Sequence, residues 1–225
     1  MTYQPHEFWQ ILLAPGTHDR GPATGHSGFY PAVLPDGSQL VLPIRVLPGD
    51  GQSAVASLII TQASFAVEDA LASALTELVA PFVPDIIVGV PTLGLPLAAN
   101  VARRLGHSRI VPLGTSRKFW YRDDLSVPLK SITTPGGGKT LFLDPRMLPL
   151  LEHRRVALID DVISSGQSIT SALNLLERAG IKPVVIGCAM LQGEAWKTAL
   201  PDHVETIVAP LHTPRLRLVG QGWFE

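Results

Sequence analysis

The chain has 225 residues, of which 46% are hydrophobic, and this length fits one α/β domain with an appendage or two small domains. Its 18 basic and 19 acidic side chains give a formal net charge of -1, so composition gives no support to a nucleic-acid or membrane partner. The single cysteine, Cys188, excludes an intramolecular disulfide, and the first residues lack a signal-like pattern, so we expect a cytoplasmic protein.

The N-terminal part of the chain predicts an irregular arm followed by a β-hairpin. Residues 1–27 are rich in glycine and proline and show no sustained period. Two apolar runs, 29–34 and 39–47, flank a Pro-Asp-Gly-Ser turn signal, and a further short strand is expected at 54–60. We therefore expect residues 1–66 to form an arm and a hairpin that acts as a hood or flanking lobe.

From residue 67 the pattern changes to alternating helices and strands. Helical spacing over 67–79 is followed by a continuous apolar run at 86–90, of the kind expected of a buried parallel strand. Further along the chain we expect helices at 97–105 and 168–179, and strands at 110–113, 140–143, 156–159, 184–190 and 204–209. This order predicts an α/β core over 67–225, ending in a C-terminal tail, with a parallel sheet of about five strands flanked by helices.

Residues 121–138 interrupt this alternation and contain three consecutive glycines, 136–138. A long insertion without structure is usually functional or disordered. The following Gly-Lys-Thr resembles the end of a nucleotide hydrolase phosphate loop. However, Thr133 stands where that motif needs glycine, and 141–143 predicts a strand where the motif needs a helix. We therefore reject the hydrolase interpretation.

The segment 156–168 combines an apolar strand, two acids and a loop of small polar residues. Asp160 and Asp161 would emerge at the carboxyl end of the strand, where open α/β sheets bind ligands. The loop 164–168 would offer backbone N–H groups and hydroxyls at a helix N-terminus, which favours an anion. Together these groups suit a sugar phosphate. A plainer interpretation is that the acids end a strand and cap the following helix.

This segment resembles the PRPP (5-phosphoribosyl-1-pyrophosphate) motif of the type I phosphoribosyltransferases. The resemblance implies that Asp160 and Asp161 bind the ribose hydroxyls of PRPP and that 164–168 holds its 5-phosphate. Gln167 stands where many members have glycine, and a positive φ at glutamine would cost about 1 to 2 kcal/mol. The PRPP-binding residues expected after the acids are Val162, Ile163, Ser164, Ser165, Gly166, Gln167 and Ser168.

Two earlier segments fit the same family order, closest to its adenine- and xanthine-transferase branch. The turn after the strand at 86–90 resembles the family's pyrophosphate loop, with Pro91, Thr92, Leu93 and Gly94 as the expected contacts. Arg117 and Lys118 precede the insertion and are candidates for contacting pyrophosphate, across a dimer interface as in relatives. The alternative is a solvated basic pair on a strand edge.

The resemblance implies a transferase that joins a nucleobase, expected to be a purine, to PRPP and releases pyrophosphate. Asp160, Asp161, Arg117 and Lys118 are the expected catalytic residues, Mg²⁺ is expected to arrive with PRPP near the acids, and Trp196 is a candidate for stacking on the base. A homodimer is expected. The competing hypothesis is a regulator that senses PRPP without turnover.

Overall fold

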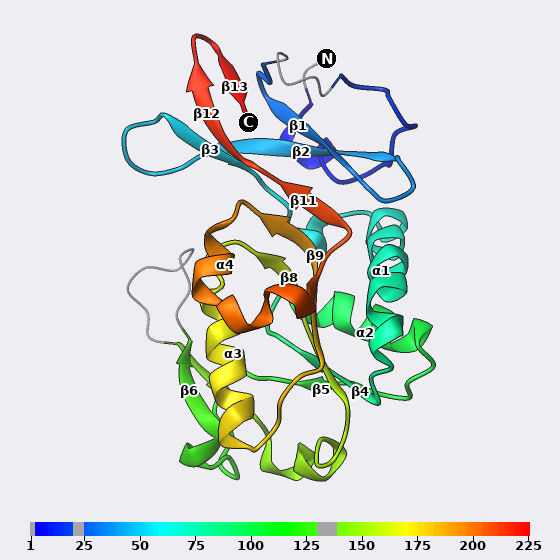
Figure 1. Ribbon diagram of the computed structural model, residues 1–225, viewed down its shortest axis with the longest axis vertical. Coiled ribbons are helices and arrows are strands. Elements are labelled where there is room, and N and C mark those ends of the chain that lie inside the picture. The colour runs from blue at the N-terminus through cyan, green and yellow to red at the C-terminus, as the bar shows by residue number, and fades with distance from the viewer. Residues whose placement is uncertain (1–2, 20–24, 130–138) are drawn as a thin grey trace.

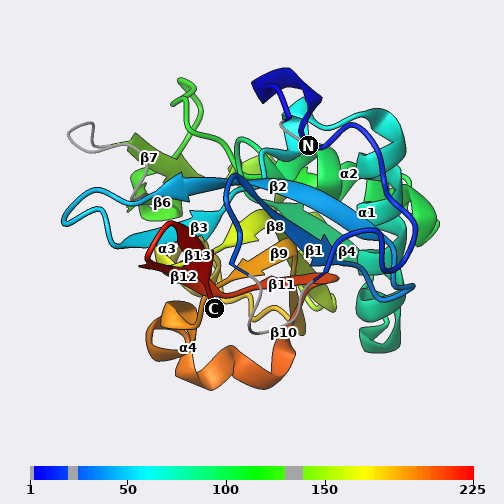
Figure 2. The same cartoon turned by 90° about the horizontal axis from the view of Figure 1, so that it is seen from above.

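The computed structural model describes residues 3–19, 25–129 and 139–225. Figure 1 shows two layers: a small antiparallel sheet at the top, close to both chain ends, and an α/β body below it. Viewed from above, the strands of the small sheet cross over the body (Figure 2). The small sheet therefore covers one end of the core.

The core is a six-stranded sheet in the order β10-β9-β8-β4-β5, with β11 also paired to β9. All of its strand pairs are parallel. This confirms the predicted fold class. The bounds are β4 Ile86–Gly89, β5 Val111–Pro112, β8 Val156–Ile163, β9 Val185–Gln192, β10 Ile207–Val208 and β11 Leu211–Thr213.

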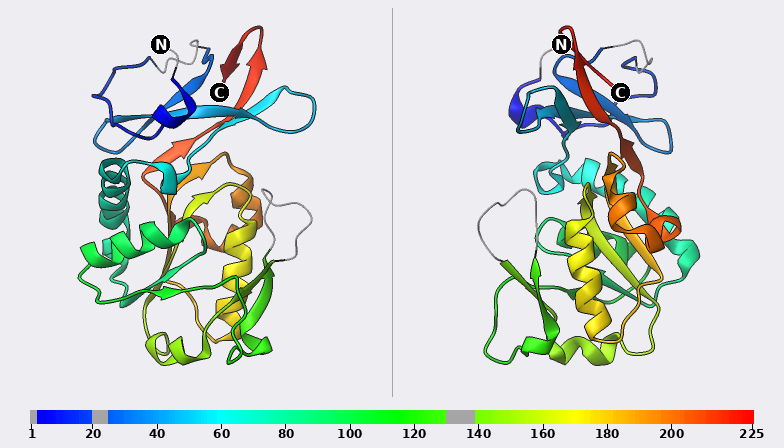
Figure 3. Two further views of the ribbon diagram at one scale, coloured as in Figure 1. Left: turned by 180° about the vertical axis from the view of Figure 1, so that it is seen from behind. Right: turned by 60° about the vertical axis from the view of Figure 1, so that its left-hand side comes forward.

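Helices cover both faces of this sheet (Figure 3). Alternate residues of β8 point to opposite faces: Ala157 joins the hydrophobic cluster under α1 and α2, whereas Leu158 joins the cluster under α3. Ser64 caps α1, because its hydroxyl oxygen accepts from the Val67 N–H at 3.3 Å. Within the described ranges, no helix is both long and apolar enough to cross a membrane. The α-helices are α1 Phe65–Val79, α2 Gly94–Arg104, α3 Gln167–Arg178 and α4 Ala195–Ala199, and the 3-10 turns are η1 Pro5–Glu7, η2 Ile60–Gln62, η3 Ala80–Phe82, η4 Asp123–Leu125, η5 Pro145–Leu150 and η6 Pro201–Thr206.

The small sheet, which we call the hood sheet, has the order β1-β2-β3-β12-β13. The predicted hairpin is present as β1 and β2, paired antiparallel. The C-terminal tail, which the sequence groups with the core, supplies β12 and β13 of the hood sheet. Residues 215–217 of β12 pair with β3, and β13 pairs with β12. The bounds are β1 Phe29–Val33, β2 Gln39–Val46, β3 Ser53–Ala56, β12 Arg215–Val219 and β13 Gly222–Phe224.

Residues 123–129 of the insertion form regular structure, which corrects the expectation of a structureless segment. Strand β6, Ser126–Leu129, pairs antiparallel with β7, Lys139–Phe142, outside the parallel sheet. Val127 and Leu141 are buried in the cluster under α3, and this burial holds the hairpin in place. Because Lys139 begins a strand, the hydrolase interpretation stays rejected. Residues 130–138, with the three glycines, lie outside the described residues.

Truncation of Leu75 tests the packing of α1 on the parallel sheet. Leu75 is fully buried, and its Cδ1 lies 3.1 Å from the position that a Cβ on Gly187 of β9 would take. Leu75→Ala should lower the free energy of unfolding by about 2 to 5 kcal/mol, because it removes transfer free energy and leaves a cavity. Phe65→Ala on the same helix is the control, since Phe65 is 89% exposed. Urea unfolding should show a change within about 0.5 kcal/mol for the control; equal losses in both variants would contradict this packing.

Candidate functional site

Asp160 lies inside β8, with Cys188 of β9 directly opposite. The sequence predicts that the strand ends at Ile159, but the ladder continues through Val162 and Ile163, which pair with β9. Asp160 is consequently only 5% exposed, and Asp161 is partly buried. The acid pair is therefore part of a strand at the carboxyl end of the parallel sheet and does not project from a loop.

The turn before α2 packs directly against this acid. A Cβ on Gly94 would lie 2.8 Å from Asp160 Cα and 2.9 Å from its Oδ1, so glycine is required by the close approach. The Val90 N–H donates to the Ile159 carbonyl at 2.9 Å, and the Pro91-Thr92 peptide is cis. The structure therefore brings together the predicted pyrophosphate turn and the acid pair.

Burial controls the electrostatics of the pair. Desolvation raises the pKa of the Asp160 carboxyl well above its ordinary value, and the Asp161 charge adds to this rise. The pKa of Asp161 is also raised, again first by burial. The Asp161 N–H donates to Asp160 Oδ1 at 2.9 Å. Two carboxylates that are partly shielded from water in this way are well suited to accept hydrogen bonds from ligand hydroxyls.

Cys188, opposite Asp160, is fully buried, and its Sγ donates to the Met190 carbonyl at 3.3 Å. Burial raises the pKa of its thiol well above the ordinary value, and the Asp160 charge adds to this. Cys188 therefore behaves as a small core side chain, as its apolar sequence context predicts.

The loop 164–168 leads into the N-terminus of α3. The residue with positive φ is Gly166, at +80°, whereas Gln167 is the first residue of the helix and does not have a positive φ. The glutamine therefore causes no backbone strain here. No side chain caps α3, and Ser165 Oγ is a distant acceptor, 3.4 Å from the Gln167 nitrogen. An uncapped helix N-terminus directs N–H groups and a partial positive charge toward an anion.

The remaining predicted residues lie apart from this cluster. Arg117 is about half exposed and forms an ion pair with Asp123. Among the described residues, no contact connects Arg117 or Lys118 to the acid pair. Trp196 is 4% exposed, sits in the hydrophobic cluster under α3 and donates to the Gly193 carbonyl at 3.1 Å. Since its ring faces core side chains, stacking on a base would require it to move.

Sequence reasoning missed the connection between the hood sheet and the end of β9. Gln192 Nε2 donates to the Ala56 carbonyl at 2.6 Å, and the Gly193 N–H donates to the Thr213 carbonyl at 2.7 Å. The Gln192 bond joins the end of β9 to β3 of the hood sheet, whereas the Gly193 bond joins it to β11 within the core sheet. The Gln192 bond therefore places the hood sheet at the carboxyl end of β9. The available signal was the Arg-Leu-Arg-Leu alternation at 215–218, a period-2 pattern that predicts a half-buried strand.

Residues 55–211 match the family model of the phosphoribosyl transferase domain, a span that holds the acid pair, the turn at Gly94 and the α3 N-terminus. The chain belongs to this family. One similar curated protein is the bifunctional protein PyrR of Mycolicibacterium paratuberculosis, which is 34% identical over 47% of this chain and 52% of the relative. Another is the bifunctional protein PyrR of Corynebacterium diphtheriae, which is 33% identical over 59% of this chain and 65% of the relative. The chain thus spans about half to two thirds of the length of these relatives.

Solved structures show the same fold. The adenine phosphoribosyltransferase of Giardia lamblia, complexed with 9-deazaadenine, has a TM-score of 0.59 at 23% identity over 75% of this chain and 93% of that one. The adenine phosphoribosyltransferase of Thermoanaerobacter pseudethanolicus has a TM-score of 0.59 at 18% identity, and the match covers 76% of this chain and 95% of that one. The type I phosphoribosyltransferase fold and the adenine-transferase layout expected from the sequence are therefore confirmed.

Replacing Asp160 with Asn should stabilise the ligand-free fold at neutral pH. A carboxyl whose pKa is raised on folding holds its proton more tightly in the folded chain, so it lowers stability as pH rises from the unfolded to the folded pKa. Each pKa unit corresponds to about 1.4 kcal/mol. Urea unfolding should find Asp160→Asn more stable than wild type at about pH 7, with the difference shrinking toward the ordinary aspartate value of 3.8. The exposed Asp202→Asn serves as control; a variant less stable than wild type at neutral pH would refute the raised pKa.

Proposed function

We propose that this chain is an enzyme that transfers the 5-phosphoribosyl group of PRPP to a nucleobase and releases pyrophosphate. The observation that carries the proposal is the meeting of three elements: the acid pair of β8, the Gly94 turn that packs on Asp160, and the uncapped N-terminus of α3 that follows the pair. These elements supply hydroxyl acceptors and an anion site in one segment of the fold.

Each part of the substrate has a proposed partner. Asp160 and Asp161 accept hydrogen bonds from the ribose hydroxyls, and 164–168 binds the 5-phosphate through its backbone N–H groups. The turn 91–94 binds the pyrophosphate. In the reaction the bond from ribose C1 to the pyrophosphate oxygen breaks and the departing oxygen keeps the electron pair. A base nitrogen bonds to C1 and loses its proton to the departing pyrophosphate or to solvent. The protein contributes by positioning the reactants and by stabilising charge.

Mg²⁺ fits this donor set as an ion bound jointly by substrate and protein. Among the described residues, no group of three or more histidine, cysteine or acidic side chains could hold a metal alone. Mg²⁺ is usually held by one or two carboxylates together with substrate phosphates, and Asp160 and Asp161 are the carboxylates available beside the turn. When bound, the ion would neutralise charge on the leaving pyrophosphate.

Arg117 and Lys118 are proposed to reach pyrophosphate from a partner subunit of a cytoplasmic homodimer. The neighbouring Phe119 is 96% exposed. A large apolar side chain this open beside a basic pair supports a partner surface there. Arg117 would have to exchange its ion pair with Asp123 for the ligand, and an ion pair this exposed is weak enough to allow the exchange, because solvent screens it.

The acceptor is proposed to be a purine, supported by the adenine-transferase layout of the fold. A PRPP-sensing regulator is the second candidate, because the curated relatives are named bifunctional and extend beyond the matched region. Both candidates need the same PRPP site and differ only in turnover.

The acid pair is tested by PRPP binding. Asp160→Asn with Asp161→Asn should weaken binding at least about tenfold in calorimetry with Mg²⁺ present, since charged hydrogen bonds contribute about 1.5 to 3 kcal/mol each. Asp202→Asn with Glu205→Gln removes the same charge from exposed positions and should bind as wild type does. If the Asp160/Asp161 variant binds PRPP with wild-type affinity, the assignment of the acid pair to the PRPP site is wrong.

Turnover is tested by pyrophosphate release from PRPP and Mg²⁺ with adenine, guanine, hypoxanthine, xanthine, orotate or uracil. The proposal expects release that depends on a base, and fastest with a purine. Release only with orotate or uracil would overturn the purine assignment and keep the enzyme. Tight PRPP binding without base-dependent release would favour the sensor.

A further inference from the structure

Three arginines share the exposed face of the hood sheet. Arg45 of β2 and Arg215 of β12 both pair with Val55 of β3, and Arg217 pairs with Ser53. Directly paired residues in an antiparallel sheet project to the same side, so these arginines project together. All three are exposed. The opposite face is fully buried at Ala54, Ala56 and Leu216.

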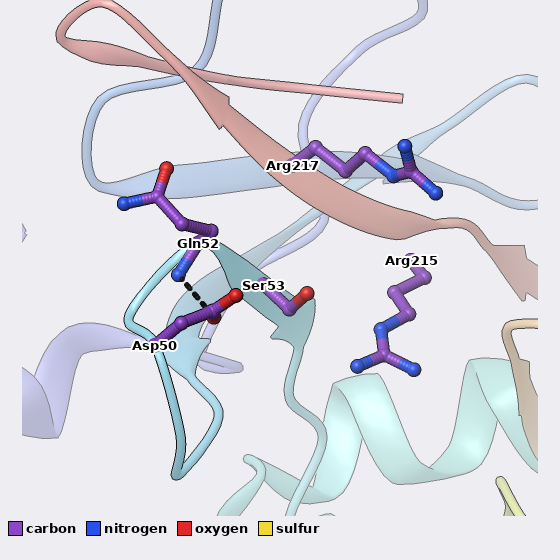
Figure 4. Close-up of a pocket in the computed structure, with 5 residues that line it drawn as sticks. All are labelled: Asp50, Gln52, Ser53, Arg215 and Arg217. Carbon is purple, nitrogen blue, oxygen red and sulfur yellow. Dashed lines mark hydrogen bonds between the residues drawn. The ribbon is translucent and has the colours of Figure 1, made fainter.

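Two of these arginines line a cavity of about 590 Å³. Figure 4 shows Arg215 and Arg217 on β12, with their side chains extending in different directions, and the other lining residues, Ser53 of β3 and Asp50 and Gln52 of the loop before it. The Asp50 carboxylate accepts from the Gln52 N–H at 2.9 Å. Within the described part of the chain, neither guanidinium forms an ion pair or a side-chain hydrogen bond. The lining therefore carries two positive charges against the one negative charge of Asp50.

This arrangement favours an oxyanion as ligand. Residues two apart on a strand are about 6.6 Å apart on one face. The two arginine side chains therefore start from neighbouring positions, and rotation about their side-chain bonds would bring both guanidinium groups to one group of oxygens. Each guanidinium presents a planar set of N–H donors that matches carboxylate or phosphate, and the Ser53 hydroxyl adds another donor. Every residue that lines the cavity is polar. Charge and hydrogen bonding, rather than stacking on a ring, are thus the means of recognition here.

The cavity lies beside the carboxyl end of β9. The Cβ of Arg215 is 3.9 Å from the position that a Cβ on Gly193 would take, and Gly193 directly follows β9. The cavity shares no lining residue with the acid pair, the Gly94 turn or the α3 N-terminus. It is therefore an additional site on the hood sheet, outside the segments assigned to PRPP.

We propose that Arg215, Arg217 and Ser53 form a binding site for the oxyanion of a small ligand, a phosphate or a carboxylate. The site goes beyond the proposed transferase function and does not depend on it. Occupancy would relieve the repulsion between the two guanidinium groups and connect β3 to β12 through the ligand.

Calorimetry at low ionic strength tests this site with two probes, inorganic phosphate and citrate, which distinguish phosphate from carboxylate. The titrations use the Asp160→Asn, Asp161→Asn protein and are fitted with two independent sites, because the loop 164–168 is itself proposed to bind phosphate. The arginine substitutions below leave 164–168 unchanged, so the site that they weaken is the cavity on the hood sheet, and the two proposals fail independently. Binding of at least one probe is expected. Adding Arg215→Gln and Arg217→Gln should weaken the binding of the probe at least about tenfold, which corresponds to about 1.4 kcal/mol.

The matched control adds Arg103→Gln and Arg109→Gln, two exposed arginines outside the cavity, and should leave the affinity unchanged. Arg215→Lys with Arg217→Lys keeps the charge and the fold but removes the planar donors, so it should also weaken binding. This second variant keeps the test valid if the glutamine variant does not fold. The proposal is overturned if both Arg215/Arg217 variants bind the probe as tightly as the parent protein does. It is also overturned if the control loses as much affinity as they do, or if the parent binds neither probe.

Discussion

The close approach of Gly94 to Asp160 is the constraint on which the candidate site depends. A Cβ at residue 94 would stand 2.8 Å from the Asp160 Cα, closer than side-chain carbons come to backbone. This contact fixes where α2 begins relative to β8 and holds the turn 91–94 over the acid pair. The pairing of β8 with β4 on one side and β9 on the other keeps Asp160 from moving away. Strand register and one glycine together therefore determine the geometry of the pair.

Burial of the acid pair also creates a conflict between the stability of the fold and the binding of a ligand. Burial raises the pKa of both carboxyls, so keeping them charged at neutral pH costs folding free energy. On the proposed function, the ribose hydroxyls and Mg²⁺ would offset that cost. The helix N-terminus after Gly166 adds a positive potential on the other side of the same loop. Acid and anion sites are thus brought into one short segment.

Much of the core was predictable because its strands are continuous apolar runs, as in 86–90 and 184–190, and its helices have clear periods. The PRPP-like segment was recognisable for the same reason, since its acids and small residues directly follow such a run. The strands β12 and β13 were not predicted. The Arg-Leu alternation at 215–218 was a signal for β12, but its partner β3 is distant in sequence, and β13 is only three residues long. Strand β6 was hidden by Pro128 and its polar neighbours. The burial of Trp196 and the contact of Gly94 with Asp160 depend on tertiary packing, which no local pattern encodes.

The central claim is that the Gly94 turn and Asp160 form one PRPP site, and the PRPP affinity of Gly94→Ala tests it most directly. Gly114→Ala is the matched control, because among the described residues a Cβ there would meet only the Tyr121 hydroxyl, at an ordinary 3.7 Å. Calorimetry with Mg²⁺ should show affinity reduced at least about tenfold for Gly94→Ala, equivalent to about 1.4 kcal/mol, in a protein that still folds by circular dichroism, and unchanged affinity for Gly114→Ala. Wild-type PRPP affinity in a folded Gly94→Ala protein would contradict the account.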